Sequence, residues 1–204
     1  YIFDARVMID VLQRNALRDS AHDFGKEIIP DMYPRMKVHA YEFGKNHVPG
    51  EEGHNRGYWR DVGTVDAYFE ASMDLVSVTP QFNLYNPLWP IVSAPMNLPP
   101  AKFVFADSKS QRIGIATDSM VSDGAIISGG TINRCILHPR VRIHSYSDID
   151  ESILMDGVEI GRHSRIRRAV INKGGKVPSG TALGYGLGAD AQRTTVTASG
   201  VAAG

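Results

Sequence analysis

Residues 58–64 hold the side chains whose order most clearly suggests chemistry. They read Tyr-Trp-Arg-Asp-Val-Gly-Thr, so the carboxylate of Asp61 follows strand-like aromatic residues and precedes a suitable helix N-cap, Thr64. A carboxylate between a strand end and a helix start lies where α/β folds bind their ligands, and there it can hold Mg²⁺ against phosphate groups. The pattern is equally consistent with an Asp61 side chain that only caps its own turn.

A second group of candidate residues is basic. Arg165, Arg167 and Arg168 lie within four residues of one another, and Lys173 follows five residues after Arg168. Arginine and lysine bind phosphate through charge-assisted hydrogen bonds, so Arg167, Arg168 and Lys173 are candidates for binding an anionic effector. A face that contacts only water has the same composition, and the sequence leaves both interpretations open.

Histidines suggest further sites, which the sequence supports less well. His22 and Asp23 could act as an acid–base pair, but Ser20 followed by an acidic residue three positions later is more typical of a helix N-terminus. His47 and His54, with the two glutamates between them, lack the regular spacing of metal ligands. We therefore interpret residues 44–57 as a polar, mobile loop.

The strongest pattern among the elements that must position these residues is a repeat of 17 residues between positions 125 and 184. Its apolar residues recur in columns, in the order Ile126, Ile143, Ile160 and Val177; Ile132, Ile149, Ile166 and Leu183; Leu137, Leu154 and Ile171; and Ile136, Ile153 and Val170. A fixed period with three apolar anchors per cycle predicts a parallel β-helix of about four coils. The six-residue spacing is similar to that of hexapeptide-repeat proteins, whose β-helix is left-handed.

Residues 1–79 combine strand-like and helical patterns, which is typical of an α/β fold. We expect strands at residues 1–4, at residues 37–43 and around Tyr58 and Trp59.

Three helices are expected in the same part of the chain. An apolar stripe at helical spacing predicts the first over residues 5–17. The second begins at Ser20 and ends at Pro30 or Pro34, and the third covers residues 65–76.

The middle of the chain is rich in proline. Residues 77–102 contain six of the eleven prolines, which predicts an extended connector, and a strand at 101–104 leads into the β-helix. Residues 194–204 are small and polar, and we expect them to be loosely held. The predicted domains are 1–79, the end of the α/β domain; 80–104, the connector; and 105–204, the β-helix.

The composition limits the class of protein. The 22 basic and 22 acidic residues give no net charge, so nothing predicts nucleic acid or a membrane as partner. Cys135 is the single cysteine, which excludes an internal disulfide and is typical of a cytoplasmic protein. The chain lacks an initiator Met and starts within strand-like residues, so we expect an N-terminally truncated piece of a larger protein.

Several segments resemble, in family order, those of ADP-glucose pyrophosphorylases (glucose-1-phosphate adenylyltransferases). The similarity covers nearly the whole chain, to about Gly200. It rests on residues 20–26 with Ile29-Pro30, and on residues 58–64, 89–91, 98–104, 127–129, 140–142 and 165–171. The resemblance implies a doubly wound, Rossmann-like α/β nucleotidyltransferase domain joined to a C-terminal left-handed β-helix.

The resemblance also implies an activity and its ligands. Family members make ADP-glucose and pyrophosphate from ATP and glucose 1-phosphate, for glycogen or starch synthesis. Asp61 matches a family Mg²⁺ ligand with a catalytic role, and Trp59 and Gly63 would shape the substrate loop around it. The family is typically a homotetramer with allosteric sugar-phosphate or nucleotide effectors, bound in part by basic residues of the β-helix. Lys173 stands where some bacterial members carry an effector-contacting arginine.

Other family motifs are missing from these residues. The Gly-rich phosphate loop, the Glu-Lys-Pro sugar-phosphate segment and the second metal-binding aspartate do not occur, so we expect the chain alone to be inactive. Two alternatives remain open. One is a non-catalytic regulatory homologue, and the other is a hexapeptide-repeat acyltransferase, in which His138, His144 or His163 would act as a base.

Overall fold

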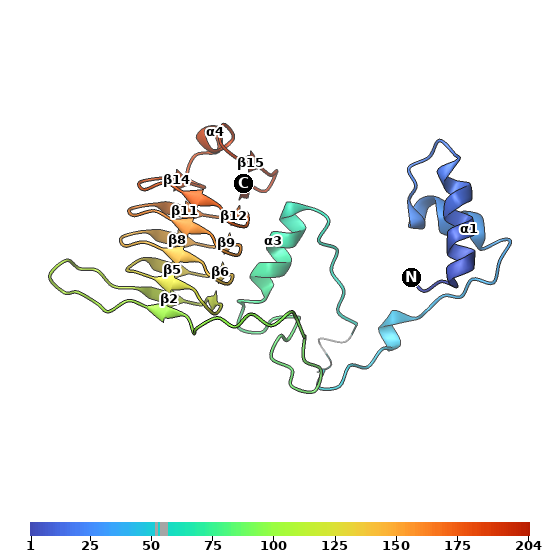
Figure 1. Cartoon of the computed structure of the whole chain (residues 1–204), viewed down its shortest axis with the longest axis horizontal. Coiled ribbons are helices and arrows are strands. Elements are labelled where there is room, and N and C mark those ends of the chain that lie inside the picture. The colour runs from blue at the N-terminus through green and yellow to red at the C-terminus, as the bar shows by residue number, and fades with distance from the viewer. Residues whose placement is uncertain (52, 54–56) are drawn as a thin grey trace. The chain divides into compact units, whose positions relative to one another are not determined.

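The computed structural model describes residues 1–51, 53 and 57–204 (Figure 1). The chain divides into two compact units, Tyr1–Lys45 and Asn46–Gly204. No helix in the described part of the chain is both long and apolar enough to cross a membrane.

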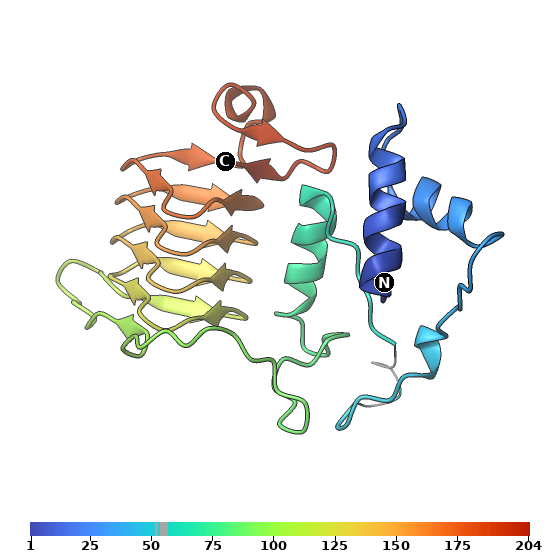
Figure 2. The ribbon, with the colours of Figure 1, turned by 45° about the vertical axis from the view of Figure 1, so that its right-hand side comes forward.

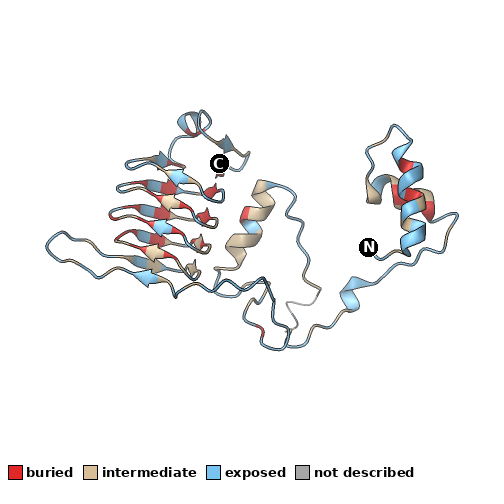
Figure 3. Ribbon diagram, in the orientation of Figure 1, coloured by how far each residue is buried: buried red, intermediate tan, exposed pale blue. Residues whose placement is uncertain are grey.

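The first unit consists of short helices around a small apolar core. Helix α1 covers Ala5–Ala16, as predicted; it is followed by the π-helix η1 (Phe24–Ile28), helix α2 (Ile29–Met32) and the 3₁₀ helix η2 (Phe43–Lys45). Val11, Ile28 and Met32 are buried together, and Phe3, Phe24 and Met36 pack around them. Figure 3 shows buried residues on α1 and on the helical segment beside it.

The second helical segment starts later than predicted, and it ends at Met32 with Tyr33 as C-cap, directly before Pro34, one of the two predicted ends. It begins at Asp23, whose side chain accepts the Lys26 N–H at 2.7 Å, and not at Ser20. Pro30 does not end it, because a proline in the first turn of α2 removes an N–H that has no helical partner there.

The prediction of strands before the connector is wrong. The described residues contain no strand before Lys102, so residues 1–4, 37–43 and 58–59 lack regular β structure. A strand needs a neighbouring strand to satisfy its N–H and C=O groups, and none of the sheets formed by the described residues includes these segments.

The second unit is built on a parallel β-helix with three stacks of short strands (Figures 1 and 2). The first stack holds β1 (Lys102–Phe103), β4 (Ile126–Ile127), β7 (Arg142–Ile143), β10 (Glu159–Ile160) and β13 (Lys176–Val177). The second holds β2 (Ile115–Thr117), β5 (Thr131–Asn133), β8 (Asp148–Asp150), β11 (Arg165–Arg167) and β14 (Ala182–Leu183). The third holds β3 (Met120–Val121), β6 (Ile136–Leu137), β9 (Ile153–Leu154), β12 (Ala169–Ile171), β16 (Ala202–Ala203) and β15 (Thr195–Val196).

The β-helix is longer than the repeat predicted. Each stack has five parallel strands, because β1 to β3 form a coil ahead of residue 125 and β16 joins the last coil. The expectation that residues 194–204 are loosely held is therefore wrong. Short helix α4 (Leu187–Asp190) leads to β15, which pairs antiparallel with β16, and β16 pairs parallel with β12 and buries Ala202.

The inward columns of the β-helix follow the predicted register with one exception. Ile132, Ile149 and Ile166 pair in sequence and are fully buried, as are Leu137 and Leu154. In the first stack, however, Ile143 pairs with Ile127 and not with Ile126.

The cause of this shift is a shortened corner at Gly129 and Gly130. Only four residues separate Ile127 from Ile132, whereas five separate Ile143 from Ile149. Gly129 has a φ of 146°, and a Cβ on Gly130 would lie 2.9 Å from the Ser147 carbonyl oxygen. Two glycines allow this corner to turn with one residue fewer.

Helix α3 (Val65–Asp74) covers the outer side of the third stack. Figure 2 shows it alongside the strands β6, β9 and β12. Phe69 of α3 is buried with Ile153, Val170 and Val201. The column Ile136, Ile153 and Val170 therefore faces outward onto this helix.

Candidate functional site

The Asp61 carboxylate lies in a turn that leads directly into α3. Its Oδ1 accepts the Gly63 N–H at 2.9 Å, and Thr64 Oγ1 accepts the Ala67 N–H at 3.1 Å, so Thr64 is the N-cap as predicted. A Cβ on residue 63 would lie 3.1 Å from Asp61 Oδ1, so Gly63 permits this close approach. Asp61 therefore does cap its own turn, which is one of the two predicted roles. The same hydrogen bond also holds Asp61 Oδ1 in a defined position.

The surroundings of Asp61 are open. Asp61 and Gly63 are exposed, and the Trp59 side chain is 70% exposed. Arg60 Nη2 donates to Gln81 Oε1 at 2.6 Å, which ties the loop to the start of the connector.

Asp61 fits Mg²⁺ as a single ligand and not as part of a complete protein site. Among the described residues, no three His, Cys, Asp or Glu side chains are grouped closely enough to hold a metal ion. Mg²⁺ is commonly bound by one or two carboxylates, with water and substrate phosphates as the other ligands. An exposed carboxylate with one oxygen held by a backbone N–H is suited to that kind of binding.

The three basic candidate residues lie on one coil but at two of its corners. Arg167 ends β11 and Arg168 lies between β11 and β12, whereas Lys173 follows β12. Each has an acidic neighbour: the closest nitrogen–oxygen distances are 3.6 Å from Arg167 to Asp150, 3.6 Å from Arg168 to Glu151 and 3.8 Å from Lys173 to Asp156. The structure therefore does not bring Lys173 together with the two arginines. Arg165, the other basic residue considered, places its guanidinium 4.3 Å from the Tyr185 ring centre.

The Lys173 corner contains a cation that the sequence analysis missed. Arg140 donates two hydrogen bonds to Asp156, at 3.1 Å and 2.6 Å. These bonds, and then the positive charges of Arg140, Lys173 and His138, hold the pKa of Asp156 below its usual value. Lys173 follows Asp156 by one repeat, so the period itself indicated that they are neighbours.

The histidines of the β-helix act separately. His144 Nε2 lies 2.7 Å from Glu159 Oε1, His163 stacks on Tyr146, and burial lowers the pKa of His138. His144 and Glu159 line an open groove of about 350 Å³ with Arg162, Lys176 and Ser179. His144 and His163 therefore contact different partners and do not share one site.

The histidines before the β-helix were also candidates for sites. His22 Nδ1 lies 2.7 Å from Asn15 Oδ1, while Asp23 caps η1, so the two do not form an acid–base pair. The metal hypothesis for His47 and His54 depends on residues outside the described part of the chain, because His54 is not described.

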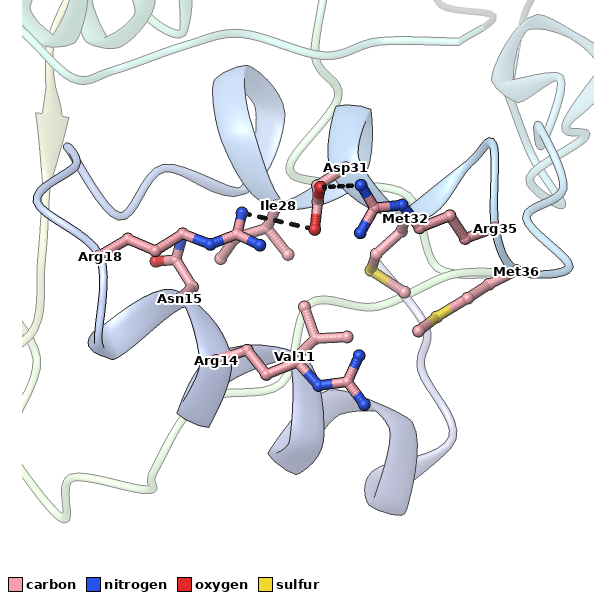
Figure 4. Close-up of a pocket in the computed structure, with 9 residues that line it drawn as sticks. All are labelled: Val11, Arg14, Asn15, Arg18, Ile28, Asp31, Met32, Arg35 and Met36. Carbon is pink, nitrogen blue, oxygen red and sulfur yellow. Dashed lines mark ion pairs between the residues drawn. The ribbon is translucent and has the colours of Figure 1, made fainter.

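The first unit contains a small cavity of about 20 Å³ between α1 and α2 (Figure 4). Asp31 pairs there with Arg18 at 3.5 Å and with Arg35 at 3.4 Å. This volume holds about one water molecule, so it is not a substrate site.

Comparison with protein families identifies both parts of the chain. The family described as "GlmU-like, C-terminal hexapeptide" matches residues 99–203, more than half of the chain. The chain belongs to this hexapeptide family. The predicted hexapeptide repeats are thereby confirmed, and the left-handed sense predicted for the β-helix is that of such repeats. A second family, "Nucleotidyl transferase", matches residues 1–78, as the sequence analysis predicted.

Curated relatives of this hexapeptide-family chain are glucose-1-phosphate adenylyltransferases. The protein of that name from Anaeromyxobacter sp. (strain Fw109-5) is 52% identical over 98% of this chain and 49% of its own length. Those from Koribacter versatilis (strain Ellin345) and Deinococcus radiodurans are 47% and 46% identical over 98% of this chain, and 47% and 49% of their own lengths. The predicted resemblance is confirmed, and the chain spans about half the length of these relatives.

Proposed function

We propose that this chain is part of a glucose-1-phosphate adenylyltransferase, which makes ADP-glucose and pyrophosphate from ATP and glucose 1-phosphate. The similarity to enzymes of that name along 98% of the chain supports the proposal. The observation that carries it within this chain is the Asp61 turn, an exposed carboxylate held by the Gly63 N–H at the start of α3.

The proposed reaction transfers an adenylyl group. A phosphate oxygen of glucose 1-phosphate attacks the α-phosphorus of ATP, and the bond from that phosphorus to the pyrophosphate oxygen breaks. Asp61 would hold Mg²⁺, which supplies positive charge against the phosphates. The Gly63 N–H fixes the direction of the carboxylate, and Trp59 would form the adjacent wall of the substrate loop.

The setting of this activity is also proposed. We assign residues 1–79 to the nucleotidyltransferase domain, 80–104 to the connector and 105–204 to the β-helix. We propose a cytoplasmic homotetramer that serves glycogen or starch synthesis and responds to anionic sugar-phosphate or nucleotide effectors.

The proposed activity is tested with the 204-residue chain and with a longer protein that includes the upstream nucleotidyltransferase residues. With ATP, glucose 1-phosphate and Mg²⁺, the longer protein is expected to release pyrophosphate and form ADP-glucose, and chelation of Mg²⁺ should stop both. The 204-residue chain is expected to release none, because no Gly-rich phosphate loop precedes Asp61. Pyrophosphate release by the short chain would contradict this expectation. Failure of the longer protein would favour the non-catalytic regulatory homologue.

Lys173→Ala is expected to raise the effector concentration needed for half-maximal activation by about tenfold, the cost of one charge-assisted hydrogen bond. Lys173 is an exposed cation whose partner, Asp156, is already engaged by Arg140. The measurement is activation of the longer protein by a sugar bisphosphate and by a nucleoside monophosphate. Lys176→Ala is the matched control, an exposed lysine on β13 that should leave the response unchanged. An unchanged response of Lys173→Ala at an unchanged Tm would assign Lys173 to a face that contacts only water.

A further inference from the structure

Helix α3 is held on the β-helix first by apolar contacts. Phe69 is 5% exposed and packs in one cluster with Ile153, Val170 and Val201. Val65, Tyr68 and Met73 of the same helix pack against that cluster. The helix therefore contacts three parts of the unit: β9, β12 and the turn that precedes β16.

A polar contact fixes the first turn of α3 on the C-terminal segment. Ser199 Oγ donates to Asp66 Oδ1 at 2.7 Å. Hydrogen bonds from Thr197 and from Ser199 hold the pKa of Asp66 below its usual value, so the carboxylate is charged at neutral pH. Asp66 lies five positions after Asp61, in the first turn of α3, which directly follows the Asp61 turn.

Arg168 connects the corner of the β-helix with both of these contacts. Its guanidinium lies 5.4 Å from the centre of the Phe69 ring, and its Nη2 donates to the Ser199 carbonyl oxygen at 3.5 Å. Its Nη1 lies 3.6 Å from Glu151 Oε2, which anchors the side chain to the preceding coil. Arg168 thus contacts the helix, the segment that holds it and the β-helix itself.

An arginine equivalent to Arg168, Arg134, lies at the same corner two coils earlier. Arg134, Glu151 and Arg168 follow one another by single repeats and have φ values of 50°, 43° and 46°. Arg134 pairs with the same Glu151, at 2.7 Å. Arg168 differs from it by its contacts with Phe69 and Ser199.

The segment between the Asp61 carboxylate and α3 is short and is held by two side-chain hydrogen bonds. Thr64 caps the helix, and the Gly63 N–H immediately before it donates to Asp61. A change in the position of the first turn of α3 must therefore move the Asp61 turn with it.

We propose that the docking of α3 on the β-helix positions the Asp61 turn for metal binding, with Arg168 and Ser199 as positioning residues. The inference rests on the proposed function for the role of Asp61. It assigns to Arg168 a task that differs from effector contact: the arginine holds the helix that presents the carboxylate.

The docking itself is tested on the 204-residue chain by hydrogen–deuterium exchange of residues 62–74. Arg168→Ala and Ser199→Ala are each expected to speed amide exchange there by about tenfold, because each removes a contact of the helix with the β-helix. Arg134→Ala is the matched control, since Arg134 also pairs with Glu151 and also has a positive φ. It should leave exchange in α3 unchanged. Equal effects of Arg134→Ala and Arg168→Ala would overturn the docking role.

The positioning role is tested on the longer protein by the Mg²⁺ concentration that gives half-maximal turnover. Arg168→Ala and Ser199→Ala are expected to raise this concentration about fivefold or more, while Arg134→Ala leaves it unchanged. Arg168→Lys, which keeps the charge and loses the planar guanidinium, should recover part of the loss. Because Ser199 is exposed, Ser199→Ala keeps the test informative should Arg168→Ala fail to fold.

The outcomes separate this proposal from the proposed function. Faster exchange in α3 with unchanged Mg²⁺ dependence would overturn the positioning role and leave the enzyme assignment intact. An altered effector response with unchanged exchange and Mg²⁺ dependence would make Arg168 an effector ligand only. Absence of activity in the wild-type longer protein would count against the proposed function, and the exchange experiment would still decide the docking.

Discussion

Asp61→Asn in the longer protein is expected to lower turnover by about two to four powers of ten, because it removes several kcal/mol of charge stabilisation in the transition state. Asparagine keeps the shape of the side chain and an oxygen that can accept the Gly63 N–H, so the turn before α3 should persist. The measurement is turnover as a function of Mg²⁺ concentration, beside a thermal melting curve of the same variant.

Asp74→Asn is the matched control for Asp61→Asn. Asp74 ends the same helix, and its Oδ2 accepts the Gln81 N–H at 2.9 Å. It should leave both turnover and Mg²⁺ dependence close to normal. If Asp61 only caps its turn, Asp61→Asn should cost about 1 kcal/mol of stability or less and leave turnover unchanged. Near-normal turnover with normal Mg²⁺ dependence would thus exclude the metal-ligand role.

Leu154→Ala is expected to lower the free energy of unfolding by about 2–5 kcal/mol, because it removes buried methyl groups and leaves a cavity between coils. Leu154 is fully buried on β9 and pairs with Leu137 and Ile171 in the adjoining coils. Denaturant unfolding of the 204-residue chain, followed by circular dichroism, measures the loss.

Leu88→Ala is the control for the loss of the same atoms from an exposed position. The Leu88 side chain is 67% exposed in the connector. Its replacement should change the unfolding free energy by less than about 0.5 kcal/mol. Equal costs at positions 88 and 154 would contradict the assignment of Leu154 to a packed inward column.

The sequence by itself determined the β-helix and its main columns. Each coil packs its inward apolar residues against the equivalent residues of the next coil, so residues 17 positions apart can be assigned to one column from the sequence. This is why Ile149, Ile160 and Ile166 could be placed correctly without coordinates. The turn before α3 was also predictable, because an Asp, a Gly and a Thr act through contacts with their immediate neighbours.

Features that depend on contacts distant in sequence were decided by the tertiary structure alone. The period does not say that Ile153 and Val170 face outward, because their burial depends on Phe69, some 84 and 101 positions away in a helix outside the repeat. Nor does the composition of residues 194–204 indicate that β16 completes the third stack, since that edge exists only once β12 is in place.

The same reason explains the errors at the corners and in the first hundred residues. A strand-like pattern produces a strand only where a neighbouring strand pairs with it, and none of the sheets formed by the described residues includes residues 37–43. Arg168 and Lys173 are close in sequence, yet β12 separates them into two corners with different carboxylates. The residue types were visible in the sequence, but which of them meet was determined by the folding of the chain into coils.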